Sequence, residues 1–457
     1  MVRDMTEGRP IRLILSFFFP LLIGNLFQQM YNMADSIIVG QIVGKDALAA
    51  VGATGSFNFL VLGFALGLCS GLCIPVSQHF GAGDMYAMRR ALVNAIYITL
   101  GVTAVITAAM LVFTRPMLRV MRTPENIFEQ SYDYIIVIFG GTFATLLYNL
   151  PAGLLRALGD SKTPLLFLII ASLLNIALDL LFILAFHMGV AGAAWATVIA
   201  QAVSGALCIR YIVRHFPVLR PEKGEWKFDA KSAGRGLAIG IPMGLQFSLT
   251  AVGSVVLQSA VNTLGSDAVA AITAGSKVQM IMTQPMEALG ATMATYCGQN
   301  LGAKRVDRIR WGLRTSLLLG AAYTVVAMLV SFRFGSTISL LFIKAEETQL
   351  LQNIDLFLAC NAAGFVLLMA LLVLRNALQG LGYSMSAMLA GIFEMVARAL
   401  VAFAFVAPFG YGAVCFANPL AWLFACFLLI PMIVVRVRQL GRRFPGGEEG
   451  ARLPDGV

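Results

Sequence analysis

Two carboxylates in this sequence lie where they could bind a cation or exchange a proton inside a membrane. Asp35 follows Gln28 and Tyr31 at spacings that place the three side chains on one helical face. Asp179 follows Asn175 by four residues, which again indicates a shared face. The surrounding sequence is apolar, where an ionised group costs about 2.5–3.5 kcal/mol unless it faces a cavity or a partner. Both acids are therefore candidate functional groups.

The chemistry available to such a pair is cation exchange. Hydrocarbon favours the protonated form of a carboxylate, whereas water or a bound cation favours the ionised form. If the two acids meet, they can exchange protons for Na+ or for a cationic substrate, because whichever cation binds displaces the other. This is the chemistry of an antiporter. The alternative is that Asp35 is merely solvated near a helix end and that Asp179 has a structural hydrogen bond to Asn175.

The C-terminal half carries different ionisable groups. Glu287 lies in an apolar stretch without a partner at helical spacing, which favours a polar cavity over lipid. Glu394 and Arg398 are four residues apart in the favourable order, so a neutralised intrahelical pair and a role in a cavity both remain open.

The elements that position these groups are long apolar helices. Hydrophobic residues make up 59% of the chain, charged residues 12%, and the mean hydropathy is +0.82. A bilayer core about 30 Å thick needs roughly 20 apolar residues for each helical crossing, and backbone groups in lipid must be satisfied within helices. We therefore predict an all-α membrane protein with twelve transmembrane helices. They lie near 13–38, 49–77, 91–113, 132–155, 163–186, 190–213, 236–262, 268–295, 313–334, 352–374, 384–407 and 412–435.

An internal repeat divides these helices into two sets of six. GKDALAAVGA at 44–53 returns as GSDAVAAITA at 265–274, which indicates tandem duplication. Because six is even, the halves are expected to be parallel six-helix lobes related by a pseudo-twofold axis along the membrane normal. Neither Asp35 nor Asp179 has an acidic counterpart at the repeat spacing. The predicted parts are an N-terminal lobe at 1–213, a linker at 214–235, a C-terminal lobe at 236–435 and a tail at 436–457.

Charge and motifs restrict the function. Lys and Arg concentrate at both termini and in the 214–235 linker, so these parts should face the cytoplasm of an inner-membrane protein. The net charge of +10 then reflects this bias and attraction to membrane lipids, and we expect no nucleic-acid partner. The chain contains no GxxxxGK[ST], GxSxG or HExxH motif and no metal-ligand spacing among its seven cysteines. We predict no enzyme activity, no cofactor and no metal site beyond one for Na+.

Three segments resemble the multidrug and toxic compound extrusion (MATE) transporters. They are YNMADSIIVGQIVGKDALAAVGA at 31–53, RALGDSKTP at 156–164 and QNLGA at 299–303, within a resemblance that covers nearly the whole chain. The resemblance implies an antiporter that expels amphipathic, often cationic compounds in exchange for H+ or Na+. It matches Asp35, Asn175, Asp179 and Thr197 to the family's cation site, and Gln28, Tyr31 and Asn149 to positions that line the first-lobe cavity.

The seventh predicted helix departs from the family pattern. Other members carry a carboxylate there for a second-lobe ion site, but GLQFSLTAVG at 244–253 has Gln246 and no acid. We therefore expect coupling in the first lobe. A second-lobe substrate cavity would be lined by Gln246, Glu287, Glu394 and Arg398.

These observations predict a monomeric secondary exporter that antiports small drugs or organic cations against H+ or Na+ by alternating access. The residue types do not decide between the two ions. The first alternative is a flippase for a lipid-linked oligosaccharide or lipid, although fourteen helices and a basic cavity are typical of that group. The second is a membrane-embedded enzyme or scaffold, for which the sequence shows no catalytic constellation.

Overall fold

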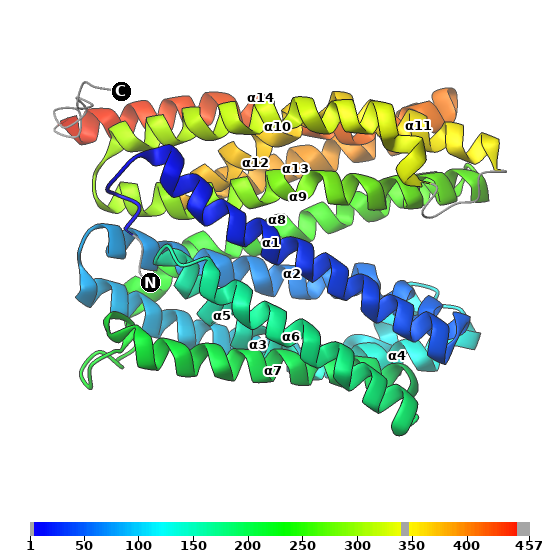
Figure 1. Cartoon of the computed structure of the whole chain (residues 1–457), viewed down its shortest axis with the longest axis horizontal. Coiled ribbons are helices and arrows are strands. Elements are labelled where there is room, and N and C mark those ends of the chain that lie inside the picture. Colours follow the sequence, from blue (N-terminus) through cyan, green and yellow to red (C-terminus); the bar gives the residue numbers. More distant parts are fainter. Residues whose placement is uncertain (1–3, 340–346, 446–457) are drawn as a thin grey trace. The chain divides into compact units, whose positions relative to one another are not determined.

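The structure is a computed structural model that describes residues 4–339 and 347–445, and no strand occurs among them (Figure 1). The helices of the N-terminal half are α1 (Pro10–Ile38), α2 (Lys45–Gly81), α3 (Met85–Val120), α4 (Glu125–Gly140), α5 (Thr142–Ala157), α6 (Lys162–Leu180) and α7 (Gly189–His215). Those of the C-terminal half are α8 (Ala230–Asn262), α9 (Ser266–Gly302), α10 (Val306–Ser339), α11 (Thr348–Ala363), α12 (Phe365–Gly380), α13 (Ser384–Leu400) and α14 (Val406–Arg443). Three π-helical turns, η1 (Val39–Val43), η2 (Leu181–Ala185) and η4 (Val401–Phe405), follow α1, α6 and α13, and a 3-10 turn, η3 (Pro217–Leu219), follows α7.

Ten of the twelve predicted apolar runs lie within a helix or a bent pair of helices, whereas 163–186 continues from α6 through η2, and 384–407 continues from α13 through η4 into α14. The runs 132–155 and 352–374 are bent pairs, because the chain turns by 46° between α4 and α5 and by 49° between α11 and α12. Among the described residues, eight helices are long and apolar enough to span a membrane, or ten if each bent pair is one span. One of the eight is Ser384–Arg443, whose 60 residues far exceed the roughly 20 that a single crossing needs. Together α13 and α14 are long enough for two.

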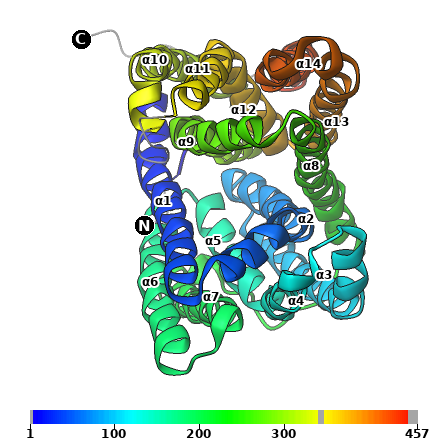
Figure 2. The same cartoon turned by 90° about the vertical axis from the view of Figure 1, so that its right-hand side faces the viewer.

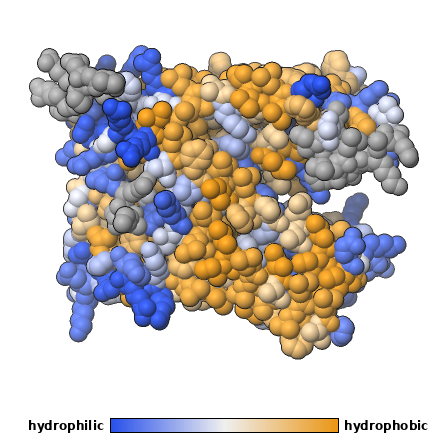
Figure 3. Space-filling view, viewed as in Figure 1, coloured by the Kyte–Doolittle hydropathy of each residue, from blue (hydrophilic) through white to orange (hydrophobic). Residues whose placement is uncertain are grey.

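The surface agrees with a membrane protein. On the face shown in Figure 3, apolar side chains cover the middle of the helices and hydrophilic side chains gather toward the helix ends. Exposed side chains such as Phe427 (81%) and Phe403 (80%) would be costly in water but suit lipid. α14 remains helical through Arg443, so the first residues of the predicted 436–457 tail continue this helix. The rest of that predicted tail, from residue 446, lies outside the described residues.

Two compact units make up the chain, and α1 and α8 each contribute to both. Unit 1 contains Phe19–Gly244, and unit 2 contains Met5–Phe18 and the chain from Leu245 onward. The segment predicted as a linker therefore lies within unit 1. Figure 2 looks along the helices and shows the bundle of α2–α7 in unit 1 and that of α9–α14 in unit 2.

Glycines allow the helices of unit 1 to approach closely. A Cβ on Gly205 of α7 would lie 2.8 Å from the backbone of Leu147 in α5, nearer than real Cβ contacts allow. Where the first part of α8 crosses α2, Gly71 and Gly240 meet in the same manner. These contacts fix α5 and α7, which form two walls of the site described below.

The 214–235 segment is fastened to α3. Arg89 donates two hydrogen bonds to the carboxylate of Glu225, from Nε at 2.6 Å and from Nη2 at 2.7 Å. Tyr97 donates from its hydroxyl to the Trp226 carbonyl at 2.9 Å. The pairing with Arg89 lowers the pKa of Glu225 below its usual value of 4.5. The predicted linker is therefore packed against α3 within unit 1.

The N-terminal segment is held in unit 2 by buried side chains. The Met5 amide donates to Oε1 of Gln299 at 2.8 Å. Its carbonyl accepts from Nδ2 of Asn300 at 3.1 Å and from Nη2 of Arg308 at 3.2 Å. Gln299 and Asn300 belong to the QNLGA segment, so part of that motif has a structural role.

Candidate cation site and polar cavity

The two acids of the N-terminal half are both buried beside irregular helical turns. Asp35 is 9% exposed and lies just before η1, and Asp179 is fully buried just before η2. The two π-helical turns contact each other. π-Helical turns within helices are frequent at functional sites. In this protein they bring the polar faces of α1 and α6 together.

The carboxyl groups of Asp35 and Asp179 lie within hydrogen-bonding reach of each other. On each side chain Oδ1 is buried without a protein partner. Two ionised carboxylates about 4 Å apart would repel each other by about 4 kcal/mol at an effective dielectric constant of 20. The pair is therefore stable only if it shares a proton or holds a cation. This arrangement contradicts the alternative in which Asp35 is solvated at a helix end.

Neutral side chains complete the cluster. With its amide oriented to satisfy both ends, Asn175 donates to Asp179 Oδ2 at 3.1 Å and accepts from the Thr197 hydroxyl at 3.2 Å. Tyr31 hydrogen-bonds to Thr197 through its own hydroxyl. The alternative in which Asp179 has a structural hydrogen bond to Asn175 is therefore correct about the bond, but the bond belongs to a larger polar cluster. Carboxylate, amide and hydroxyl oxygens are the ligands that hard cations prefer.

The sequence interpretation missed one member of this cluster, Tyr134 of α4. Its side chain is buried and close enough to interact electrostatically with Asp35, Asp179 and Tyr31. An isolated tyrosine in an apolar run carries no local signal that distinguishes it from a packing residue. Only the packing of α4 against the other helices places it here.

A polar cavity reaches the cluster between α1, α5, α6 and α7. Tyr31, Asn175 and Thr197 form part of its wall, and the two acids lie behind them. Its volume is about 90 Å³, well below the 300–1,000 Å³ of pockets for drug-sized ligands. In this conformation the cavity has room for an ion with a few waters, and a larger substrate would require it to widen. Its remaining polar wall consists of Asn25, Gln28, Asn149, Arg156, Ser161, Ser172 and Gln201.

The predicted cavity residues Gln28 and Asn149 are among those in the wall, whereas Arg156 was not predicted. Arg156 belongs to the RALGDSKTP segment and is partly buried. Among the described residues, no hydrogen bond or ion pair engages its guanidinium group. The first-lobe cavity is therefore not purely acidic, because a free cation lies in the same wall.

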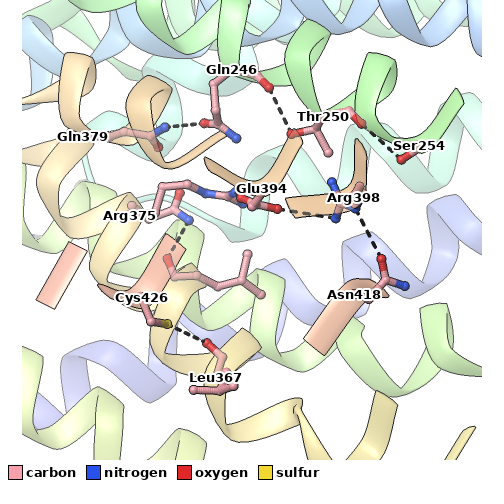
Figure 4. A network of polar contacts seen from close by, with 12 residues as sticks. Gln246, Thr250, Ser254, Leu367, Arg375, Gln379, Glu394, Arg398, Asn418 and Cys426 are labelled. Atoms are coloured by element: carbon pink, nitrogen blue, oxygen red, sulfur yellow. Dashed lines mark hydrogen bonds and ion pairs between the residues drawn. The ribbon is translucent and has the colours of Figure 1, made fainter. Parts of the chain in front are cut away.

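Figure 4 shows the ionisable centre of unit 2. Glu394 pairs with Arg398 at 3.5 Å, and also with Arg375 of α12 at 3.3 Å. Arg398 donates from Nε to Oδ1 of Asn418 at 3.3 Å, while its Nη1 is buried without a partner. The intrahelical pair therefore exists, but the sequence did not predict the second arginine. Two guanidinium groups therefore contact the carboxylate of Glu394.

Of the other two residues predicted for a second-lobe cavity, Glu287 lies close enough to this centre to interact electrostatically with Arg375 and Glu394, whereas Gln246 bonds to a neutral partner. Gln246 is buried and accepts a hydrogen bond from Gln379 at 2.8 Å. Glu287 is exposed on α9, and no hydrogen bond joins it to the described residues. The seven cysteines are buried and unpaired. No group of three or more His, Cys, Asp or Glu that could hold a metal occurs within 4–339 and 347–445.

The fold defines a multi-pass α-helical membrane protein, and its first repeat holds a buried pair of carboxyl groups beside a polar cavity. Comparison with known proteins identifies the class further. The family model MatE matches the chain twice, at residues 20–181 and 242–404, in agreement with the internal repeat. The chain belongs to this family of multidrug efflux transporters.

Similar proteins support the assignment. The probable multidrug resistance protein YpnP of Bacillus subtilis is 32% identical over 67% of this chain and 68% of its own. The FAD transporter of Shewanella oneidensis is 23% identical over 84% and 85%. A MATE multidrug transporter in an outward-facing conformation superposes with a TM-score of 0.90 at 22% identity, over 96% of this chain and 98% of the other. The predicted all-helical, two-lobe fold and the MATE resemblance are confirmed.

Proposed function

We propose that this protein exports drugs or other organic cations from the cytoplasm in exchange for H+ or Na+ that binds at Asp35 and Asp179. The observation that carries the proposal is the contact between these buried carboxylates. A pair that must be neutralised by a proton or a cation, beside a cavity wide enough for an ion, is suited to binding and releasing that ion.

The proposed cycle follows from charge balance. The empty, ionised pair attracts either the coupling ion or a cationic substrate. Loading by H+ or Na+ neutralises the pair and favours release of substrate outside, and unloading on the inner side restores the charge. Alternating access lets the same groups meet each side in turn. The proposed setting is the inner membrane, with both termini in the cytoplasm and the protein acting as a monomer.

The second lobe is proposed to take no coupling ion. Glu394 already has two positively charged partners, Arg375 and Arg398, so its carboxylate is neutralised without a further cation. Gln246 stands where other family members are expected to carry an acid. Coupling therefore belongs to the first lobe.

Arg156 affects which charged groups a bound substrate can carry. A free guanidinium group in the cavity wall could accept a carboxylate or phosphate of a zwitterionic compound. One relative is named an FAD transporter, and FAD carries phosphates. Organic cations are our first candidate substrates, because the acid pair is buried at the end of the cavity. Compounds that also carry an anionic group are the second.

The test is export from cells that express the protein. Asp35→Asn and Asp179→Asn should each abolish export of a cationic dye such as ethidium, because each removes the charge that the ion exchanges with. Asp133→Asn is the matched control, since Asp133 is exposed on α4 and outside the cluster. Export by the two site variants equal to that of wild type, at equal amounts in the membrane, would contradict the proposal.

A further inference from the structure

Unit 1 contains a second cavity, larger and far more apolar than the first. It lies between α3, α5, α7 and the segment that follows α7, and its volume is about 420 Å³. That volume falls within the 300–1,000 Å³ range of ligand sites. Its wall includes Leu100, Phe143, Ile209 and Val213, all of them partly exposed at the surface of their helices. The cavity therefore opens outward from the bundle.

The segment that follows η3 forms the mouth of this cavity and is held against α3. Arg220 and Trp226 contribute to the wall, and both follow η3. The pairing of Glu225 with Arg89 and the bond from Tyr97 to the Trp226 carbonyl hold the segment against α3. Trp226 is 46% exposed, which is typical of a tryptophan at a membrane interface.

Positive charge remains unpaired at this mouth. Arg220 donates from Nε to the Val213 carbonyl, and no other bond or ion pair engages its guanidinium group within the described chain. The neighbouring acids Glu222 and Glu225 both lie against Arg89. Anionic groups are thus attracted to the Arg220 end of the cavity.

A buried hydroxyl group lies deeper in the wall. Thr99 is 5% exposed, and its Oγ1 has no hydrogen-bond partner. It lies two residues beyond Tyr97, a rise of about 3 Å along the axis of α3. An unsatisfied buried donor costs roughly 1–3 kcal/mol. A ligand with an acceptor at this depth would remove that cost.

The chemical groups that line the cavity, taken in order from its mouth inward, match one class of molecule. A cation and a tryptophan lie at the mouth, a hydroxyl donor just below, and an apolar chamber beyond. We propose that this cavity binds an anionic phospholipid, with its phosphate at Arg220, an ester carbonyl at Thr99 and an acyl chain against Leu100, Phe143 and Val213. Basic residues beside a helix bundle attract such headgroups. The inference requires only that the chain lies in a membrane and does not depend on the proposed antiport.

Trp226 provides a direct test. A variant that retains Trp226 while Trp195, Trp311 and Trp422 are changed to Phe is reconstituted in vesicles with phosphatidylglycerol or phosphatidylcholine brominated on the acyl chains. Bromine quenches tryptophan fluorescence on contact, so quenching reports occupancy. The anionic lipid should quench Trp226 at about one-fifth of the concentration that the zwitterionic lipid needs, a fivefold preference that corresponds to about 1 kcal/mol for one arginine.

Variants separate a specific site from the lipid that surrounds any membrane protein. Arg220→Gln should remove the preference, and Thr99→Val should weaken quenching by both lipids. Arg119→Gln, an exposed arginine at the other end of α3, should change neither. A reporter that retains only Trp195, which lies outside the cavity, should show no headgroup preference. Equal quenching of Trp226 by the two lipids, a preference that survives Arg220→Gln, or displacement of both lipids by an exported drug would overturn the proposal.

Discussion

Ion binding at the acid pair should appear as ion-dependent stability, and Asp179→Asn should remove it. In the ionised state the two carboxylates repel each other by about 4 kcal/mol. A cation that relieves this repulsion binds only the folded protein, and at a hundred times its Kd it stabilises that state by about 2.7 kcal/mol. With an unfolding entropy of about 2.1 cal/mol/K per residue, the expected rise in Tm for a chain of this length is about 3 °C. Asparagine keeps the shape of Asp179 but leaves Asp35 as the only charge, so most of the rise should disappear.

The assay is thermal unfolding of the purified protein in detergent. NaCl is exchanged for choline chloride at constant ionic strength, and the pH is varied in a separate series. If Na+ is the ion, wild type should gain Tm with NaCl at neutral pH; if H+ is the ion, it should gain Tm only as the pH falls. Asp133→Asn should behave as wild type. An Asp179→Asn variant that responds to both series as wild type does would refute the reasoning.

Three further results are expected. Glu225→Gln should lower the free energy of unfolding by about 1–3 kcal/mol at neutral pH. Because Arg89 lowers the pKa of Glu225 below 4.5, wild type should lose this advantage only as the pH falls through that lowered value. Thermal unfolding curves of the two proteins should therefore converge in acid. Gly205→Ala should destabilise by about 1–3 kcal/mol because its Cβ has no room, whereas Gly101→Ala, which meets open space, should be neutral or stabilising by up to about 1 kcal/mol in the same assay. Glu394→Gln should cost roughly 3–5 kcal/mol, since two arginines then face each other in the interior, and an unchanged Tm would contradict this assignment.

The sequence predicted the helices and their division into repeats because both leave signals along the chain. Apolar runs of fixed length mark the spans, and the recurring GKDALAAVGA segment marks the duplication. The bends at Gly141 and Gly364 left no such signal, because a glycine in an apolar run is compatible with a straight helix. The point at which α14 ends, Arg443, also leaves no clear signal, because a basic, polar sequence is compatible with either a helix or an irregular tail.

The sequence predicted only those features of the candidate site that leave a local pattern along the chain. Helical spacing identified the polar faces of Asp35 and Asp179, since it depends only on neighbours along the chain. The contact between the two acids and the approach of Tyr134 depend on how α1, α4 and α6 pack, which no local pattern encodes.

In the second lobe, too, the sequence did not predict contacts between different helices. Spacing identified Glu394 with Arg398, whereas Arg375 comes from another helix. Glu287 of α9 also lies within electrostatic range, so the centre holds two acids and two arginines. The pairing of Glu394 with both arginines is the physical reason to expect ion coupling in the first lobe alone.

The most direct test of the central claim is efflux of a fluorescent organic cation from proteoliposomes, with wild type and Asp179→Asn compared under separately imposed Na+ and pH gradients. The proposed mechanism predicts efflux with wild type under one of these gradients, which identifies the coupling ion, and loss of that efflux in Asp179→Asn. Gradient-driven efflux that persists in folded Asp179→Asn, or its absence from folded wild type under both gradients, would contradict the claim that the first-lobe acid pair drives export.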